Sequence, residues 1–345
     1  MPRSKLDTLI LRIAAFFREH AGRYSLDPER IEVRYILNWG GFVNATFFVK
    51  DGRTTYHLKL ADDPESQVSL RRWQHFSERL QQQYHAPRML DWVKIPRTRF
   101  AGPIFEYIPG RAADYSARPE VFSGVLELVA HLHADGDLAA GLEALDGPPS
   151  TCADYFISVY IDRFDEDLLS VAGDLPPFVS LDLLSWMMGE TRELEGIARD
   201  DPAFQLPASS PTHGDLWANN VLVTQDGRWY VIDWDDLALG DPALEYGIIL
   251  GPQWRAGKMT AEEAAALLPS NDPALRRRFE ICLRALLLDE VIDSLADWVE
   301  SNFAPDHQAE VRQVKESVHR SALARYQELY GNFSHHTASG NDRLS

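Results

Sequence analysis

The sequence predicts an α+β protein with two lobes: a small lobe built on an antiparallel β-sheet, and a larger, mainly helical lobe that contains short hairpins. Residues 31–60 alternate apolar and polar side chains between turns, which is typical of antiparallel strands. From about residue 110 to residue 330 the apolar residues recur mostly at helical spacing. A Pro-Gly pair at 109–110 and a change in net charge separate the two parts of the chain.

The elements of the small lobe follow from these patterns in chain order. The first 20 residues carry apolar side chains on one helical face, and three strands follow in IEVRYIL, ATFFVK and TTYHLKL. A helix is predicted from Pro64, and an apolar strand leads up to Glu106. Two amphipathic segments of the larger lobe, DYFISVYIDRF and LDLLSWMMGETRELEGIA, are predicted core helices. His131 and His133 on another helix are expected to pack or cap, because HxH lacks further metal partners.

Net charge divides the chain of 345 residues unequally. Residues 1–110 hold 17 Lys and Arg against 12 Asp and Glu, and the remainder holds 17 against 40, which together give −18. The acidic part repels nucleic acid and favours a cationic substrate, although an acidic surface can equally serve only solubility. We therefore expect no nucleic-acid partner.

Cysteine usage and hydropathy bear on the compartment. Cys152 and Cys282 are far apart and show no metal-binding spacing, so a disulfide framework or a structural zinc is not expected. Arg12 interrupts the N-terminal apolar run, and no small-residue cleavage site follows it. No apolar stretch approaches the roughly 20 residues of a membrane span. The sequence therefore predicts a soluble, cytoplasmic protein.

The most informative pattern lies in residues 212–236, which read THGDLWANNVLV, TQDGRWY and VIDWDD. An Asp-Gly turn between apolar strands predicts a hairpin that returns Asp233 to the side of Asn220. Amide and carboxylate oxygens are the ligands that Mg²⁺ prefers. Asp215, five residues before Asn220, can accept the proton of an attacking hydroxyl. The alternative, in which these residues only cap turns and end strands, requires their identity, order and hairpin to coincide.

HGD, four further residues and Asn, followed by IDW, resemble the aminoglycoside phosphotransferase and choline kinase family of the protein-kinase-like superfamily. Gly214 stands where the protein-kinase loop has Arg. The resemblance implies a two-lobed protein-kinase-like fold, with a nucleotide-binding lobe at 1–108 and a catalytic and substrate-binding lobe at 109–332. The polar tail at 333–345 is predicted to be disordered.

The resemblance also implies ATP and Mg²⁺ as cofactors. Asp215 would be the catalytic base, and Asn220 and Asp233 would hold the metal. Two residues would support the site structurally: His213, and Asp241 of the GDP motif, which would brace the catalytic loop.

Further nucleotide contacts fall in the first lobe. Gly40 and Gly41 lie in the loop that would cover the phosphates, and Asn44 would fix that loop by hydrogen bonding. Lys59 matches the strand lysine that holds the α- and β-phosphates, and strand alternation puts it on the same face as His57.

The resemblance also implies an acidic partner for Lys59, and a hinge between the lobes at 106–108 whose backbone groups bond adenine. Glu65 and Glu78 are both candidates for the partner; Glu78 is preferred because its distance along the chain matches that in kinases, while Glu65 can stabilise a helix N-terminus. The backbones of Glu106 and Ile108 would bond the adenine edge.

The acceptor pocket is the least determined feature. Like charges four residues apart destabilise a helix by about 0.2–0.5 kcal/mol per pair, so an acidic helix face suits an amine-bearing substrate, although it can equally be a solvated face. Two further acids directly follow Trp234. The substrate candidates are Asp289, Asp293 and Asp297 on the helix, with Asp235 and Asp236 beside the catalytic segment.

These residues predict a kinase that moves the γ-phosphate of ATP to a hydroxyl of a small molecule, such as an aminoglycoside-like compound or an amino alcohol. A nucleotide-binding pseudokinase and a kinase for a sugar, an amino acid or a macrolide are the alternatives. A protein kinase is disfavoured, because IDW replaces DFG and no APE-type segment follows. The sequence leaves the oligomeric state open.

Overall fold

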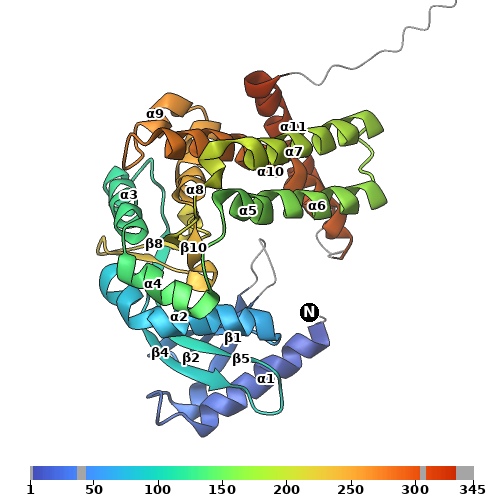
Figure 1. The fold of residues 1–345 in the computed structure, drawn as a ribbon. Coiled ribbons are helices and arrows are strands. Elements are labelled where there is room, and N and C mark those ends of the chain that lie inside the picture. The colour runs from blue at the N-terminus through green and yellow to red at the C-terminus, as the bar shows by residue number, and fades with distance from the viewer. Residues whose placement is uncertain (1–2, 37–43, 304–307, 332–345) are drawn as a thin grey trace, which may run out of the picture. The chain divides into compact units, whose positions relative to one another are not determined.

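The computed structural model describes residues 3–36, 44–303 and 308–331, which form two compact units (Figure 1). The first unit comprises Met1–Ala134 and Pro211–Ala238, and the second comprises Asp135–Ser210 and Leu239–Ser345. These units divide the chain differently from the predicted lobes, because residues 109–134 and 211–238, whose strands at 110–112 and 221–231 form one sheet, fall in the first unit. The lobe boundary at 108–109 stays a prediction, and the tail at 333–345 lies outside the described residues.

A five-stranded antiparallel sheet forms the centre of the first unit, in the strand order β1-β2-β3-β5-β4. The three strands predicted between residues 31 and 60 are confirmed, as is the strand before Glu106; the strand at 89–94 was not predicted. The strands of this sheet are β1 (Glu32–Ile36), β2 (Ala45–Lys50), β3 (Thr55–Leu60), β4 (Met89–Lys94) and β5 (Ala101–Glu106).

Helices cover both faces of this sheet. The helix α1 (Arg3–Glu19) packs its apolar face, including Ile13 and Phe17, against Leu58 and Leu60 of β3. The helix α2 (Pro64–Gln83) packs on the other face, where the Trp73 ring lies 4.3 Å from that of Phe105. Each large apolar side chain buried in this way contributes about 1.5–3 kcal/mol. Lys59 and His57 therefore point away from α1, as strand alternation predicts.

A smaller antiparallel sheet contains the hairpin predicted within residues 212–236. The strand β6 (Gly110–Ala112) pairs with β8 (Val221–Thr224), which forms the predicted hairpin with β9 (Trp229–Val231). Single-turn 3₁₀ segments precede and follow the hairpin, η4 (Ala218–Asn220) and η5 (Trp234–Asp236). The helix α3 (Pro119–His133) completes this part, and its His131 packs on Tyr84, as predicted.

The second unit is mainly helical, as predicted, and its central helix α10 (Pro273–Glu300) is buried on nearly all sides. An ion pair between Asp241 and Arg278 lies within this core, and Cys152 and Cys282 are buried free thiols. The remaining helices are α4 (Gly136–Asp146), α5 (Cys152–Phe156), a π-helical turn η2 (Ile157–Ile161), α6 (Asp162–Gly173), α7 (Leu181–Asp200), α8 (Pro242–Arg255), α9 (Ala261–Ala265) and α11 (Gln308–Tyr330).

The last sheet has two short strands, β7 (Ser210–Thr212) and β10 (Ala238–Gly240). Short 3₁₀ segments are η1 (Pro28–Arg30), η3 (Pro202–Gln205) and η6 (Ser301–Phe303). Within the described ranges, every helix is too short or too polar to cross a lipid bilayer.

Gly102 of β5 lies against the backbone of the strand that carries Lys59. A Cβ atom at Gly102 would stand 2.0 Å from the Lys59 carbonyl oxygen. We expect Gly102→Ala to lower the free energy of unfolding by about 3 kcal/mol or more, because the two strands must separate. Thermal and denaturant unfolding measure the change.

Gly189, inside α7, provides the matched control. A Cβ atom there meets no other atom within 4 Å, so Gly189→Ala should raise stability by about 0.5–1 kcal/mol through the helix propensity of alanine. Equal effects of the two substitutions would contradict the packing described for β3 and β5.

Candidate active site

A cavity of about 340 Å³ lies within the first unit, between the face of the sheet that carries Lys59 and the β8–β9 hairpin. Most of the predicted nucleotide and metal residues line it, namely Lys59, Glu106, Ile108, Asn220 and Asp233. Apolar and aromatic groups form the rest of the wall, including Phe48, Trp73 and Tyr107. Gly40 and Gly41 lie outside the described residues.

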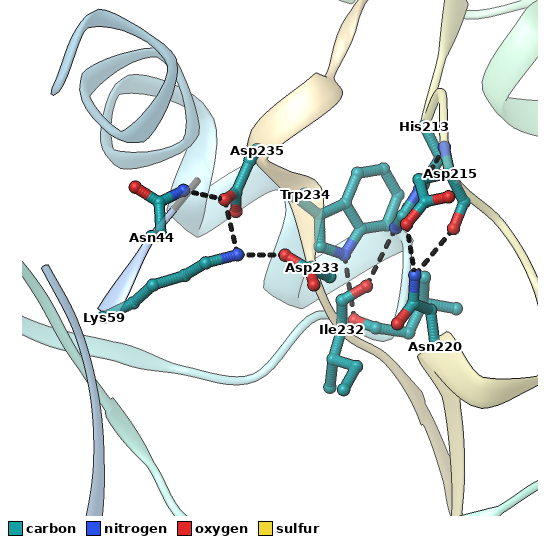
Figure 2. Close-up of polar contacts among 10 residues, drawn as sticks. Asn44, Lys59, His213, Asp215, Asn220, Ile232, Asp233, Trp234 and Asp235 are labelled. Atoms are coloured by element: carbon teal, nitrogen blue, oxygen red, sulfur yellow. Dashed lines mark hydrogen bonds and ion pairs between the residues drawn. The ribbon is translucent and has the colours of Figure 1, made fainter. Parts of the chain in front are cut away.

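Hydrogen bonds of the His213 ring and of the backbone tie the loop at 213–220 to the segment after β9. The buried His213 ring accepts the Asp215 N–H at Nδ1 (3.2 Å), and its Nε2 donates to the Ile232 carbonyl (2.9 Å; Figure 2). The Ile232 N–H in turn donates to the Asn220 carbonyl at 2.9 Å. His213 therefore holds the loop and the strand together, which fits its predicted structural part.

Asp215 and Asn220 face each other directly. The Asn220 amide nitrogen donates to the Asp215 carboxylate (2.9 Å) and to the Asp215 carbonyl (2.7 Å), as Figure 2 shows. Burial raises the pKa of the Asp215 carboxyl above its ordinary value, and the nearby Asp233 carboxylate adds to the increase. Since the Asn220 nitrogen is used here, its Oδ1 atom is the one that a cation can approach.

Gly214 explains why the loop does not carry the arginine of protein kinases. Its φ of 87° lies in the left-handed region, and a Cβ atom would stand 2.8 Å from the Asp236 Cβ and 2.9 Å from the Asp236 carbonyl oxygen. A side chain at this position would therefore push away the segment that follows Asp233.

Asp233 follows the hairpin with φ 69° and ψ 54°, a left-handed conformation that costs a non-glycine residue roughly 1–2 kcal/mol. Its carboxylate forms an ion pair with the Lys59 ammonium, and a second ion pair joins Lys59 to Asp235. Burial opposes ionisation of all three groups. The mutual attraction nevertheless holds the pKa of Asp233 below and that of Lys59 above its usual range.

The structure places Asp233 and Asp235 beside Lys59, and not the predicted Glu78. Glu78 is exposed on α2, where it accepts a hydrogen bond from Gln82 (3.1 Å), and Glu65 is exposed as well. The α2 side chain beside the ammonium is Trp73, whose ring centroid lies 5.9 Å from the Lys59 nitrogen. Helical spacing places Trp73 in the buried row and Glu78 outside it. The sequence feature that indicates the partner of Lys59 is the second acid of the IDWD segment, Asp235.

Asp235 is a substrate candidate that the structure places elsewhere. It is buried, and it accepts a hydrogen bond from the Asn44 amide nitrogen at 2.6 Å in addition to its pairing with Lys59 (Figure 2). Asn44 thus fixes the start of β2 by bonding Asp235, a residue that the sequence analysis predicts to contact the acceptor. Asp236 is exposed and stays a candidate.

Glu106 and Ile108 line the cavity from the segment after β5. The Glu106 carboxylate accepts the Arg88 N–H (2.8 Å), and the Glu106 N–H donates to the Arg88 carbonyl (3.0 Å). The Ile108 carbonyl accepts the Gly110 N–H at 2.8 Å. These bonds hold the segment that carries the predicted adenine contacts.

The residues suit a hard divalent cation. Asn220 offers an amide oxygen and Asp233 a carboxylate, and both line one cavity; Mg²⁺ typically takes one or two such protein ligands and keeps water or phosphate oxygens for the rest. Within residues 3–36, 44–303 and 308–331, no group of three or more His, Cys, Asp and Glu side chains could hold a metal. Two protein oxygen donors at one cavity fit a cation that binds together with a phosphate ligand.

The other predicted site residues lie in the second unit. Asp241 caps α8 by accepting the Ala243 N–H (3.0 Å) and pairs with Arg278 (2.8 Å). On α10, Asp289 pairs with Arg163 and Asp297 with Lys315, while Asp293 is exposed. Cations from neighbouring helices thus relieve much of the repulsion that had suggested a cationic substrate.

Comparison with known proteins gives one family and one fold. Residues 35–281 match a family model described as "Phosphotransferase enzyme family". A Plasmodium vivax ethanolamine kinase is 15% identical, with a TM-score of 0.53 over 93% of this chain and 88% of that chain. Wild-type aminoglycoside 2'-phosphotransferase-IIIa in its GDP complex is 14% identical, with a TM-score of 0.57 over 90% of this chain and 98% of that chain.

A choline kinase from Streptococcus pneumoniae is 15% identical, with a TM-score of 0.53 over 89% of this chain and 98% of that chain. No curated protein matches the chain in sequence. The family match and these solved structures confirm the predicted resemblance and the protein-kinase-like fold.

The close approach of Gly214 to Asp236 is testable by substitution. Gly214→Ala adds both left-handed strain and a clash, whereas Gly227→Ala adds only the strain, because Gly227 has φ 86° and an added Cβ there would meet no atom within 4 Å. We expect Gly214→Ala to lose about 1–3 kcal/mol more stability than Gly227→Ala in chemical unfolding. Equal losses would show that the contact with Asp236 does not constrain the loop.

Proposed function

We propose that this chain, which belongs to the phosphotransferase enzyme family, transfers the γ-phosphate of Mg²⁺-bound ATP to a small molecule. The acceptor group is a hydroxyl, and the small molecule also bears an amine. The chain is a small-molecule kinase by family and fold. The observation that carries the rest is the meeting of Lys59, Asn220 and Asp233 at one cavity, with Asp215 bonded to Asn220.

Asp215 acts as the general base. Its carboxylate is oriented by the Asn220 amide, so one oxygen is fixed and the other can accept the proton of an acceptor hydroxyl. The raised pKa of Asp215 brings it closer to neutral pH, where a base takes up a proton more readily. An intact base of this kind argues against a pseudokinase that only binds nucleotide.

Lys59 would bind the α- and β-phosphates, and Asn220 Oδ1 with the Asp233 carboxylate would hold the cation. When bound, Mg²⁺ neutralises the charge that develops on the phosphate oxygens during transfer. The left-handed backbone at Asp233 supports this assignment, since strained conformations cluster at functional sites.

The apolar wall of the cavity suits a purine base. Phe48 and Tyr107 meet edge to face with ring centroids 5.3 Å apart, and Ile108 adjoins them at the hinge. Burial lowers the pKa of His57 to about 4, so this ring stays neutral at pH 7, and its buried Nε2 atom has no hydrogen-bond partner among the described residues. A neutral polar group can bond a nucleobase without attracting phosphate. Because one related structure is a GDP complex, GTP belongs in the same binding test as ATP.

The acceptor is an alcohol that also carries an amine. The related kinases act by name on aminoglycosides, ethanolamine and choline, which all bear nitrogen cations. The exposed Asp236, beside Gly214, is the candidate acceptor contact in the first unit. A panel of amino alcohols, aminoglycosides and neutral sugars, read out by ADP release, tests this class.

Asp215→Ala should reduce phosphoryl transfer by about 10²–10⁴-fold, because the variant cannot accept the hydroxyl proton. Affinity for Mg-ADP, measured by titration calorimetry, should change little, since Asp215 does not line the described part of the cavity. Asp7→Ala, at an exposed position on α1, is the control and should retain full turnover. An Asp215→Ala enzyme with most of its turnover would refute the assigned base.

The pH dependence of kcat/KM should report the same group. Because the raised pKa belongs to a base that must be deprotonated, activity falls as the pH falls through that value. The acidic limb should therefore lie above the ordinary aspartate pKa of about 3.9. A limb at or below that value would contradict the burial of Asp215.

A further inference from the structure

Lys59 is paired with two carboxylates that differ in their access to the cavity. The lysine side chain is 10% exposed, Asp233 is 29% exposed and Asp235 is 12% exposed. Asp233 lines the cavity, whereas Asp235 is absent from the described residues that line it. Figure 2 shows the ammonium between the two acids, with Asn44 on the far side of Asp235.

No acid from α2 reaches Lys59 in the described structure. Glu65 and Glu78 are both exposed, and the inward row of the helix presents Trp73 to the ammonium. A buried ammonium needs a carboxylate that stays with it, because an unpaired buried charge is strongly destabilising.

We propose that Asp235 is the permanent counter-ion and positioning residue of Lys59, so that Asp233 is left for the cation. The single ammonium is shared between two carboxyl groups. A divalent cation at the more accessible Asp233 would take over one of these two contacts, and Asp235 would then keep Lys59 directed at the phosphates. The catalytic part of this proposal rests on the proposed function, whereas the pairing itself does not.

Asn44 fixes the orientation of Asp235. Its amide nitrogen donates to Asp235 Oδ2 at 2.6 Å, and Asn44 directly precedes β2, which pairs with the lysine strand β3. Thr46 of β2 lies directly opposite Lys59 of β3. The position of Asp235 is therefore set by the same sheet that carries Lys59.

The pairing is tested first by stability without nucleotide. Lys59→Met leaves the buried Asp235 and the partly exposed Asp233 without their ammonium, and it should lower Tm by roughly 10 °C. Adding Asp235→Asn to that variant should recover at least half of the loss, whereas adding Glu78→Gln should recover none. The proposal fails if Asp235→Asn gives no recovery, or if Glu78→Gln recovers as much.

The positioning role is tested by Mg-ADP affinity. In the otherwise native protein, Asp235→Asn lets Lys59 turn fully to Asp233, so the apparent Kd should rise about tenfold or more, while Glu78→Gln should change it less than about twofold. In the Lys59→Met background the effect of Asp235→Asn should vanish.

Two results would overturn the positioning role: an unchanged Kd in Asp235→Asn, or an equal loss with and without Lys59, which would mean that Asp235 acts on the cation directly. A native protein that binds no Mg-ADP would contradict the proposed function together with this role. The melting experiment would then still decide the pairing of Lys59 with Asp235.

Discussion

The buried ammonium of Lys59, shared by Asp233 and Asp235, is the interaction on which the rest of the site depends. It joins two chain segments 174 residues apart, the strand β3 and the segment after the β8–β9 hairpin. Burying three charged groups is favourable only when they meet at close range. The ion pairs link the sheet to the segment after the hairpin, and the cavity lies where they meet.

Around this contact the backbone leaves little freedom. His213 bonds the Ile232 carbonyl, and the Ile232 N–H bonds the Asn220 carbonyl, so hydrogen bonds join the loop at 213–220 to the segment after β9. Trp234, fully buried, donates to the Val231 carbonyl at 2.9 Å and holds the turn that presents Asp233. A frame of this kind would keep the proposed base and the proposed metal ligands at fixed separation, which is what in-line transfer requires.

Sequence reasoning predicted the strands, the hairpin and the face of β3 that carries Lys59, because each follows from local alternation or turn chemistry. It selected the wrong partner for Lys59, since helical spacing identifies a buried row but not the residue that meets a distant strand; that residue is Trp73. It likewise treated the acids of α10 as unrelieved, because the cations Arg163 and Lys315 come from other helices. Both errors concern tertiary contacts that no local pattern encodes.

A crystal structure of the protein with Mg-ADP would test the shared ammonium and the metal ligands together. We predict a cation held by Asn220 Oδ1 and the Asp233 carboxylate, with the Lys59 ammonium still bonded to Asp235 and reaching the phosphates. A cation bound away from Asn220 and Asp233, or a Lys59 ammonium paired with a glutamate of α2, would contradict this arrangement.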